Sequence, residues 1–154
     1  MPEQDNLKVD TVAAMVRQFE LIYREHMRGL PIVNTQLSVE AVGFQTFEAH
    51  QLGVLITPWF MNLILLPGSD AWSGNSQGDM SSIEFPSGSM EFTICHDDVL
   101  GTYLSAVLFR SVADLPDQPT ALEVAEQVMK NLFLAKRRER KLSRRELLMG
   151  LRST

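Results

Sequence analysis

The feature that constrains the fold most is the apolar stretch from Leu52 to Leu66. In its second half, from Trp59 onward, both alternating sets of side chains are apolar. Successive side chains of a strand point to opposite faces of a sheet, so a strand of this kind is covered on both faces. We therefore predict a central strand at residues 59–66. Pro58 has no N–H, and it is expected at a strand start or at a bulge.

Helix and strand patterns surround this strand. Apolar residues recur at helical spacing over residues 10–28, where Asp10 or Thr11 can cap the start. A Gly- and Ser-rich run at residues 67–82 is expected to form a long loop. Alternating or apolar runs predict further strands at residues 39–49, 52–57, 83–85, 90–95 and 102–110, the last two as a hairpin.

The last part of the chain is helical and then basic. Thr120 and Glu123 form an S/T-x-x-E capping box, which opens a helix that is expected to continue to about Arg140. A run of strands with a helix before and after it indicates an α+β fold, with an antiparallel sheet flanked by the two helices. We predict a single domain at residues 1–135 and a basic helical tail at residues 136–154.

Charge divides the chain at the same point. Residues 1–135 carry 6 basic and 17 acidic side chains, whereas residues 136–154 carry 8 basic and 2 acidic ones. An acidic body attracts basic segments and repels nucleic acid, and the tail has no interleaved aromatic residues that would stack on bases. The apolar stretch is shorter than the ~18 residues of a spanning helix. The N-terminus also lacks the pattern of a secretory signal, so we predict a cytoplasmic protein that binds neither nucleic acid nor a membrane.

Patterns for catalysis and metal binding are sparse. Cys95 is the only cysteine, so no disulfide and no cysteine-pair metal site can form within the chain. Its neighbour His96 points to the opposite face of the predicted strand, which disfavours a thiol–imidazole pair. His26, His50 and His96 match no ligand spacing. We predict no enzyme, no metal and no cofactor; the alternative that stays open is a small thiol-dependent enzyme using Cys95.

Aromatic and amide residues near the central strand are candidates for partner binding. Trp59, Phe60 and Met61 are bulky side chains that suit a binding surface, although core packing is the commoner role of Phe60 and Met61. Asn62 lies mid-strand in an apolar run, so its amide either bonds a neighbouring strand or loop, or lines a groove and bonds a peptide backbone. Trp72, in the long polar loop, is the better candidate for an exposed anchor.

The tail carries a signal-like motif. Ser143, Arg144, Arg145, Leu147 and Leu148 match most of the S-R-R-x-F-L core of a twin-arginine export signal. Only a few residues follow, with no apolar region, so the motif is not expected to direct export. The alternative interpretation is a short capped helix with a solvated basic face.

One run is unusual enough in composition to indicate a family. Residues 56–68, with the sequence I-T-P-W-F-M-N-L-I-L-L-P-G, resemble the signature of the HybE/HupJ-type [NiFe]-hydrogenase assembly chaperones. The leading amphipathic helix, Phe44 and Phe47, the strand at residues 88–92 and the closing motif agree with this family. The resemblance covers residues 10–150.

The resemblance implies a non-enzymatic chaperone for the maturation of an uptake hydrogenase. Such proteins hold a precursor subunit, the small one, the large one or both, in the cytoplasm until the metal cofactor is installed and the subunits associate. The small subunit carries a twin-arginine signal, so masking it would prevent premature export. Other maturation proteins are further expected partners. Some relatives carry a rubredoxin module with C-x-x-C pairs; this chain has Cys95 alone and lacks that iron site.

Two hypotheses follow from the resemblance. In the first, Trp59, Phe60, Met61 and Asn62, with Trp72 from the loop, form or support the partner surface. An acidic body suits a basic signal peptide, and an apolar strand suits the hydrophobic segment that adjoins it. In the second, the tail occupies this groove, in its own molecule or in a neighbour's, until a client displaces it. A homo-oligomer can then form through the tail.

Overall fold

The computed structural model describes residues 2–68, 72, 74–109 and 111–134 of the chain. The described residues form two α-helices and one six-stranded antiparallel sheet, in the strand order β1-β2-β3-β6-β5-β4. In chain order the elements are α1 (Pro2–Ile22), the π-helix η1 (Tyr23–Met27), β1 (Glu40–Phe47), β2 (His50–Thr57), β3 (Phe60–Leu66), β4 (Met80–Phe85), β5 (Gly88–Asp97), β6 (Gly101–Phe109) and α2 (Gln118–Leu132).

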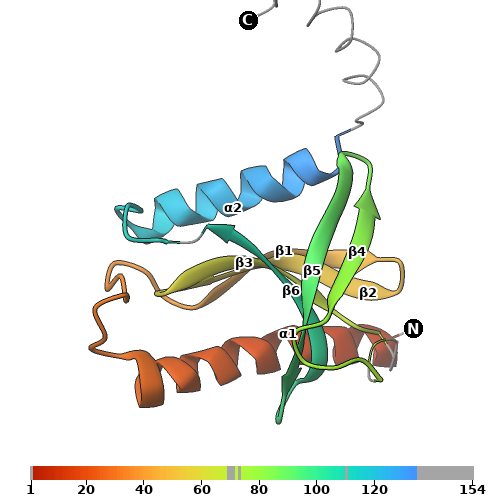
Figure 1. The fold of residues 1–154 in the computed structure, drawn as a ribbon, viewed down its shortest axis with the longest axis horizontal. Coiled ribbons are helices and arrows are strands. Elements are labelled where there is room, and N and C mark those ends of the chain that lie inside the picture. Colours follow the sequence, from red (N-terminus) through yellow and green to blue (C-terminus); the bar gives the residue numbers. More distant parts are fainter. Residues whose placement is uncertain (1, 69–71, 73, 110, 135–154) are drawn as a thin grey trace, which may run out of the picture.

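The two helices lie on opposite sides of the sheet, α1 along the bottom of Figure 1 and α2 along the top. Each helix covers its own apolar cluster. Met15 and Phe19 of α1 belong to one, the α1-side core, and Ala121, Ala125 and Met129 of α2 belong to the other, the α2-side core. The predicted α+β class, an antiparallel sheet flanked by a helix from each end of the chain, is confirmed. None of the described helices is long and apolar enough to cross a membrane.

The two cores meet across β3. Met61, Leu63 and Leu65 pack in the α2-side core, whereas Ile64 and Leu66 pack in the α1-side core. None of these five side chains is more than 2% exposed. β3 pairs with β2 on one side and with β6 on the other. The prediction of a central strand that is covered on both faces is therefore confirmed.

A two-residue turn, Pro58-Trp59, joins β2 to β3, because Thr57 pairs with Phe60 across it. The buried hydroxyl of Thr57 accepts hydrogen bonds from the N–H groups of Trp59 (3.2 Å) and Phe60 (2.9 Å). Pro58 thus lies in a turn, and not at a strand start or a bulge as predicted. The position suits proline equally well, since no neighbouring strand needs its N–H.

The N-terminal helix is longer than predicted. α1 begins at Pro2, ahead of the predicted caps Asp10 and Thr11. Proline suits the first helical turn because its missing N–H would have no partner there. At the other end α1 continues into η1, which the N–H of Arg28 closes with a hydrogen bond of 2.8 Å to the carbonyl oxygen of Tyr23.

The C-terminal helix has a different cap and an earlier end than predicted. Its N-cap is Asp117, whose carboxylate accepts a hydrogen bond of 2.9 Å from the N–H of Thr120, so Thr120 lies inside the helix. α2 ends at Leu132 and not near Arg140. The carbonyl oxygen of Leu132 accepts a hydrogen bond of 3.2 Å from the N–H of Ser87, which ties this end of the helix to the β4–β5 turn.

The strands after β3 form two antiparallel pairs. β4 begins at Met80, inside the segment that was expected to be a loop, and pairs with β5 over its whole length. The sequence pattern does not indicate the start of this strand, because Ser81 and Ser82 are small polar residues of the kind that is typical of loops. The predicted hairpin of β5 and β6 is confirmed, and the Asp97 carboxylate accepts bonds from the N–H groups of Val99 (2.7 Å) and Leu100 (2.9 Å) at its turn.

The β1–β2 turn holds two residues other than glycine in the left-handed region. The backbone φ is 49° at Glu48 and 71° at Ala49. Phe47 pairs with His50 across them, so they are the central residues of a two-residue hairpin turn. Such turns favour Asn-Gly, because a residue with a Cβ costs about 1–2 kcal/mol in this region.

Replacing Glu48 with Asn and Ala49 with Gly should therefore stabilise the protein. We expect the double variant to raise the free energy of unfolding, measured by urea denaturation, by about 1 kcal/mol. Ala13→Gly, in the interior of α1, is the matched control and should lower the same free energy by about 1 kcal/mol. A double variant that is no more stable than the original chain would contradict the assignment of strain to this turn.

Candidate functional site

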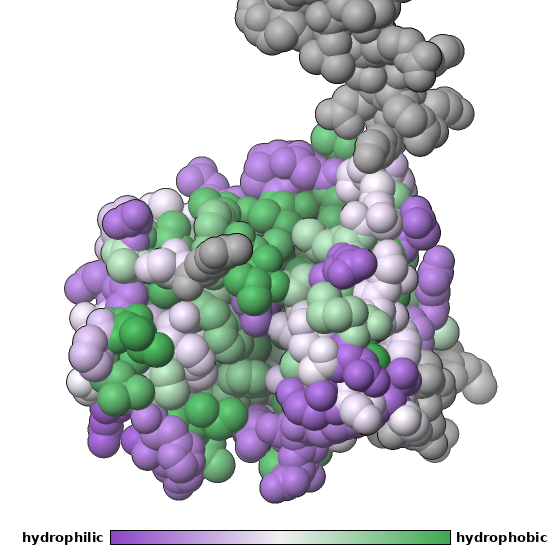
Figure 2. Space-filling view, in the orientation of Figure 1, coloured by the Kyte–Doolittle hydropathy of each residue, from purple (hydrophilic) through white to green (hydrophobic). Residues whose placement is uncertain are grey.

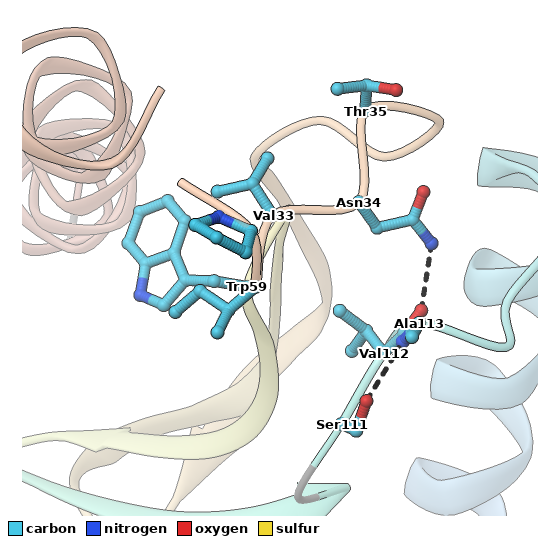
Figure 3. A pocket seen from close by; sticks show the side chains of 9 residues that line it. Val33, Asn34, Thr35, Trp59, Ser111, Val112 and Ala113 are labelled. Carbon is cyan, nitrogen blue, oxygen red and sulfur yellow. Dashed lines mark hydrogen bonds between the residues drawn. The ribbon is translucent and has the colours of Figure 1, made fainter. Parts of the chain in front are cut away.

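A pocket of about 530 Å³ opens beside the Pro58-Trp59 turn. Three segments that are distant in sequence line it: residues 31–35 after η1, Trp59 in the turn, and residues 111–113 after β6. We call these lining residues the Trp59 groove. Figure 3 shows Val33 beside the Trp59 ring and the Asn34 amide turned toward residues 111–113.

Asn34 holds the three segments together. Its N–H donates a hydrogen bond of 2.7 Å to the carbonyl oxygen of Pro58 in the turn. Its side-chain amide donates to the carbonyl oxygens of Val112 (2.8 Å) and Leu115 (2.9 Å), and its side-chain oxygen accepts from the N–H of Gln36 (2.9 Å). Hydrogen bonds from Asn34 to backbone carbonyl oxygens thus join the segments that line the groove. Asn34 is absent from the predicted site, because a lone asparagine in a loop carries no sequence pattern.

Trp59 is half-buried in an aromatic cluster at the edge of the groove. Its ring lies parallel to that of Tyr23 in η1, with the centroids 6.2 Å apart and the planes 10° apart. The rings of Phe19 and Phe60 lie 6.4 Å and 5.5 Å from it. η1 therefore presents Tyr23 to the indole, and the cluster fixes the Trp59 ring where it lines the groove.

Apolar side chains next to the groove are exposed. Ile32, which lines it, is 61% exposed, and its neighbour Leu30 is 44% exposed. On β6, Val107 is 63% exposed opposite Asn62 of β3, and Phe109 is 37% exposed near the start of residues 111–113. In the view of Figure 2 a hollow with a pale green to white floor lies near the middle of the molecule, and strongly apolar surface lies over the segment that follows η1. Clustered exposed apolar residues mark interaction sites.

The predicted site residues of β3 follow Trp59 in the chain but are not among the residues that line the groove. Phe60 packs edge-on against Phe19, with the ring centroids 5.7 Å apart, and Met61 is fully buried in the α2-side core. The side-chain N–H₂ of Asn62 donates a hydrogen bond of 2.9 Å to the Ser105 hydroxyl on β6, which agrees with the first of the two predicted alternatives, a bond to a neighbouring strand. Its buried side-chain oxygen has no hydrogen-bond partner among the described residues.

Trp72 lies apart from the other predicted site residues. Its ring centroid is 4.8 Å from that of His50, the first residue of β2, and it is half-buried against the α2-side core. The β2–β3 hairpin thus has Trp59 at one end and Trp72 at the other. Burial lowers the pKa of His50, with Glu48 opposing the shift, and its Nδ1 accepts a hydrogen bond of 3.0 Å from the N–H of Gly68.

Cys95 is a half-buried thiol in the α1-side core. Burial raises the pKa of the Cys95 thiol, and its hydrogen bond with Tyr103 opposes that shift in part. His96 lies on the other face of β5, where its ring nitrogens are 2.8 Å from the Thr102 hydroxyl and 2.8 Å from the carbonyl oxygen of Asn75. The structure therefore does not bring the thiol and the imidazole together.

The remaining sequence predictions concern the absence of a metal site and the tail. Among the described residues no group of three or more His, Cys, Asp or Glu side chains is placed to hold a metal ion. The signal-like motif at residues 143–148 lies outside the described residues. The described residues thus form a small α+β protein with an open pocket of mixed polar and apolar lining beside the Pro58-Trp59 turn.

Comparison with known proteins identifies the family. Residues 10–150 match the model of the family described as [NiFe]-hydrogenase assembly, chaperone, HybE. The chain therefore belongs to this family of hydrogenase assembly chaperones, and the predicted resemblance is confirmed. It is also similar to the solution structure of HybE from Escherichia coli, with a TM-score of 0.64 and 25% identity over 79% of this chain and 76% of that one.

Curated relatives cover different shares of their own lengths. A Rhodobacter capsulatus protein named "Probable rubredoxin HupJ" is 43% identical over 82% of this chain, but the match spans only 46% of that protein. The hydrogenase expression/formation protein HupJ of Bradyrhizobium diazoefficiens is 40% identical over 78% of this chain and 70% of its own length. The hydrogenase expression/formation protein HupT of Azotobacter chroococcum is 42% identical over 70% of this chain and 72% of its own length.

Proposed function

We propose that this chain is a non-enzymatic chaperone that binds a precursor subunit of an uptake [NiFe] hydrogenase in the cytoplasm. The client is the small subunit with its twin-arginine signal, the large subunit, or both, held until cofactor insertion and subunit assembly. Other maturation proteins are further partners in this proposal. The observation that carries it is the Trp59 groove, an open pocket with apolar and aromatic side chains in its wall, on a chain of the hydrogenase chaperone family.

The groove suits an apolar segment of the client. Ile32 and Val33 form part of its wall, and Trp59 supplies a rigid aromatic surface. Val107 and Phe109 are exposed on β6, the strand that leads to the lining residues 111–113. Bulky apolar and aromatic side chains of this kind act as anchors in protein interfaces. An export signal contains a hydrophobic segment, which such a surface can bury.

The charge of the sheet suits a basic segment. Residues 29–109, which contain all six strands, carry eight Asp and Glu side chains and no Lys or Arg. A surface with one sign of charge attracts a partner of the opposite sign and speeds the encounter. The proposed client signal joins a basic part to an apolar part, so it matches both features.

The predicted site residues take different roles in this proposal. Trp59 contacts the client directly. Phe60, Met61 and Asn62 support the groove through the packing of β3 and the bond from Asn62 to Ser105. Trp72 lies at the opposite end of the β2–β3 hairpin from Trp59. It contacts the client only if the bound segment extends along the whole hairpin.

Ile32→Asp tests the groove. We expect this substitution to lower the recovery of a hydrogenase precursor with tagged chain about tenfold, because an aspartate buried against an apolar segment leaves an unpaired charge. Ile32 is 61% exposed, so the fold should tolerate the change. The measurement is affinity purification from a host that is synthesising hydrogenase, with the precursor quantified by mass spectrometry.

Val99→Asp is the matched control for this test. Val99 is 64% exposed in the β5–β6 turn and does not line the groove. It should leave the recovery of the precursor unchanged. Equal recovery with both variants would show that the groove does not hold the client, and no hydrogenase precursor with the original chain would count against the proposed function itself.

Cys95 distinguishes a chaperone from a thiol-dependent enzyme. We expect Cys95→Ser to leave precursor recovery and hydrogenase maturation unchanged. Burial raises the pKa of this thiol, so the folded chain should react with iodoacetamide more slowly than the unfolded chain near the ordinary thiol pKa of about 8.5. The same shift contributes stability below that pKa, which is lost as the pH rises through the folded-state value. Loss of maturation in a folded Cys95→Ser variant would favour the enzyme.

The tail is proposed as a competitor for the client. Residues 143–148 imitate an export signal, and the tail carries 8 basic side chains that complement the acidic sheet. Occupying the groove of the same molecule or of a neighbour, it would link client binding to oligomeric state. Deleting residues 137–154 should raise the affinity for the client and abolish any oligomer detected by light scattering. Unchanged affinity together with an unchanged oligomeric state would rule the idea out.

A further inference from the structure

The two edges of the sheet are built differently. The pairing of β1 shifts register between Val42 and Gln45, where Gly43 has a φ of 68°, so this edge is interrupted by a bulge. β4, at the other edge, pairs with β5 in an unbroken register from Met80 to Phe85. Natural sheets protect their edges with bulges, prolines and lysines, and β4 contains none of these.

The outer side of β4 is open among the described residues. They include no other strand that pairs with β4. Phe85 packs in the α2-side core, so Met80, Ser82 and Glu84, at the alternate positions, point to the opposite face of the sheet. These three are exposed, Met80 by 57%, so α1 does not cover them. An edge strand of this kind leaves every second N–H and C=O without a partner strand.

The charge around this edge has one sign. Glu84 is exposed on β4 itself, and Glu91 is exposed on β5 directly opposite Ser82. Neighbouring strands lie about 4.8 Å apart, so a strand added next to β4 would be about 10 Å from the backbone at Glu91. An extended arginine opposite the small Ser82 side chain can span most of that distance. The described part of β4–β6 holds no Lys or Arg that would compete for these carboxylates.

We propose that β4 is a docking edge for an extended, basic polypeptide segment. The segment adds to the sheet as a further strand, its backbone pairs with β4, and its arginine or lysine side chains face Glu84 and Glu91. Main-chain pairing gives affinity in this mode, and the side chains at alternate positions give specificity. The idea deepens the proposed function and rests on it for the client, since the segment would be the basic part of the precursor's signal.

The first test locates the binding site on the full chain. The probe is a synthetic twelve-residue peptide with an adjacent arginine pair and two lysines, and its control has glutamine at all four positions. We expect the basic peptide to slow hydrogen exchange at every second amide of β4 and at none of β1, because only alternate amides face outward. Its affinity should fall as salt is added, and the glutamine peptide should not bind.

Substitutions at the two edges make the second test. Ser82→Lys should weaken binding of the basic peptide about tenfold, because a lysine next to the added strand repels its basic side chains. Gln45→Lys introduces the same charge at an exposed position of β1 and should leave the affinity unchanged. Glu84→Gln, which keeps the shape of the exposed side chain and removes its charge, should weaken binding by a smaller factor.

The outcomes separate this inference from the proposed function. Equal affinities for Ser82→Lys and Gln45→Lys, or no protection of β4 amides, would overturn the docking edge. If Ile32→Asp still lowered client recovery and Val99→Asp did not, the chaperone proposal would stand without the docking edge. Protection of β4 amides that rises with protein concentration, in the absence of peptide, would also overturn it, because the edge would then pair with a second copy of the chain.

Discussion

The burial of β3 on both faces is the constraint on which the rest of the structure depends. Each large apolar side chain that becomes fully buried stabilises a fold by about 1.5–3 kcal/mol, and β3 contributes five of them. These side chains alternate between the two cores. The core on one face of the sheet is covered by α1, and the core on the other face is covered by α2. β2 and β6 pair with β3 on its two sides.

The groove follows from that arrangement. β3 sets the position of the Pro58-Trp59 turn, and the Thr57 hydroxyl holds the turn closed. Asn34 then ties the turn to the segments on either side of it, so the pocket walls are joined by short hydrogen bonds. A pocket with this support would need little reordering if a partner bound there, which lowers the entropy cost of association. The acidic sheet adds attraction at longer range.

How much the sequence can predict depends on the range of the interaction. β3 is predictable because its two-sided apolar pattern is local, and the run around it is enough to indicate the family. The role of Asn34 cannot be predicted from its neighbours in the sequence, because its side-chain amide bonds the carbonyl oxygen of Val112, which is 78 residues away. The start of β4 is not indicated by the sequence, because its serines are typical of loops, whereas in the structure they pair with residues of β5. The separation of Trp59 from Trp72 depends on the hairpin register, which composition does not specify.

The central claim is that the Trp59 groove holds a hydrogenase precursor. The most direct measurement is photo-crosslinking in cells that are synthesising hydrogenase. One variant carries a photo-crosslinking amino acid at position 32, and a separate variant carries it at position 99. Our account predicts a crosslink from position 32 to a hydrogenase subunit, mapping within or next to its export signal when that subunit is the small one, and no such product from position 99. Crosslinks of equal yield from both positions, or from position 99 alone, would contradict it.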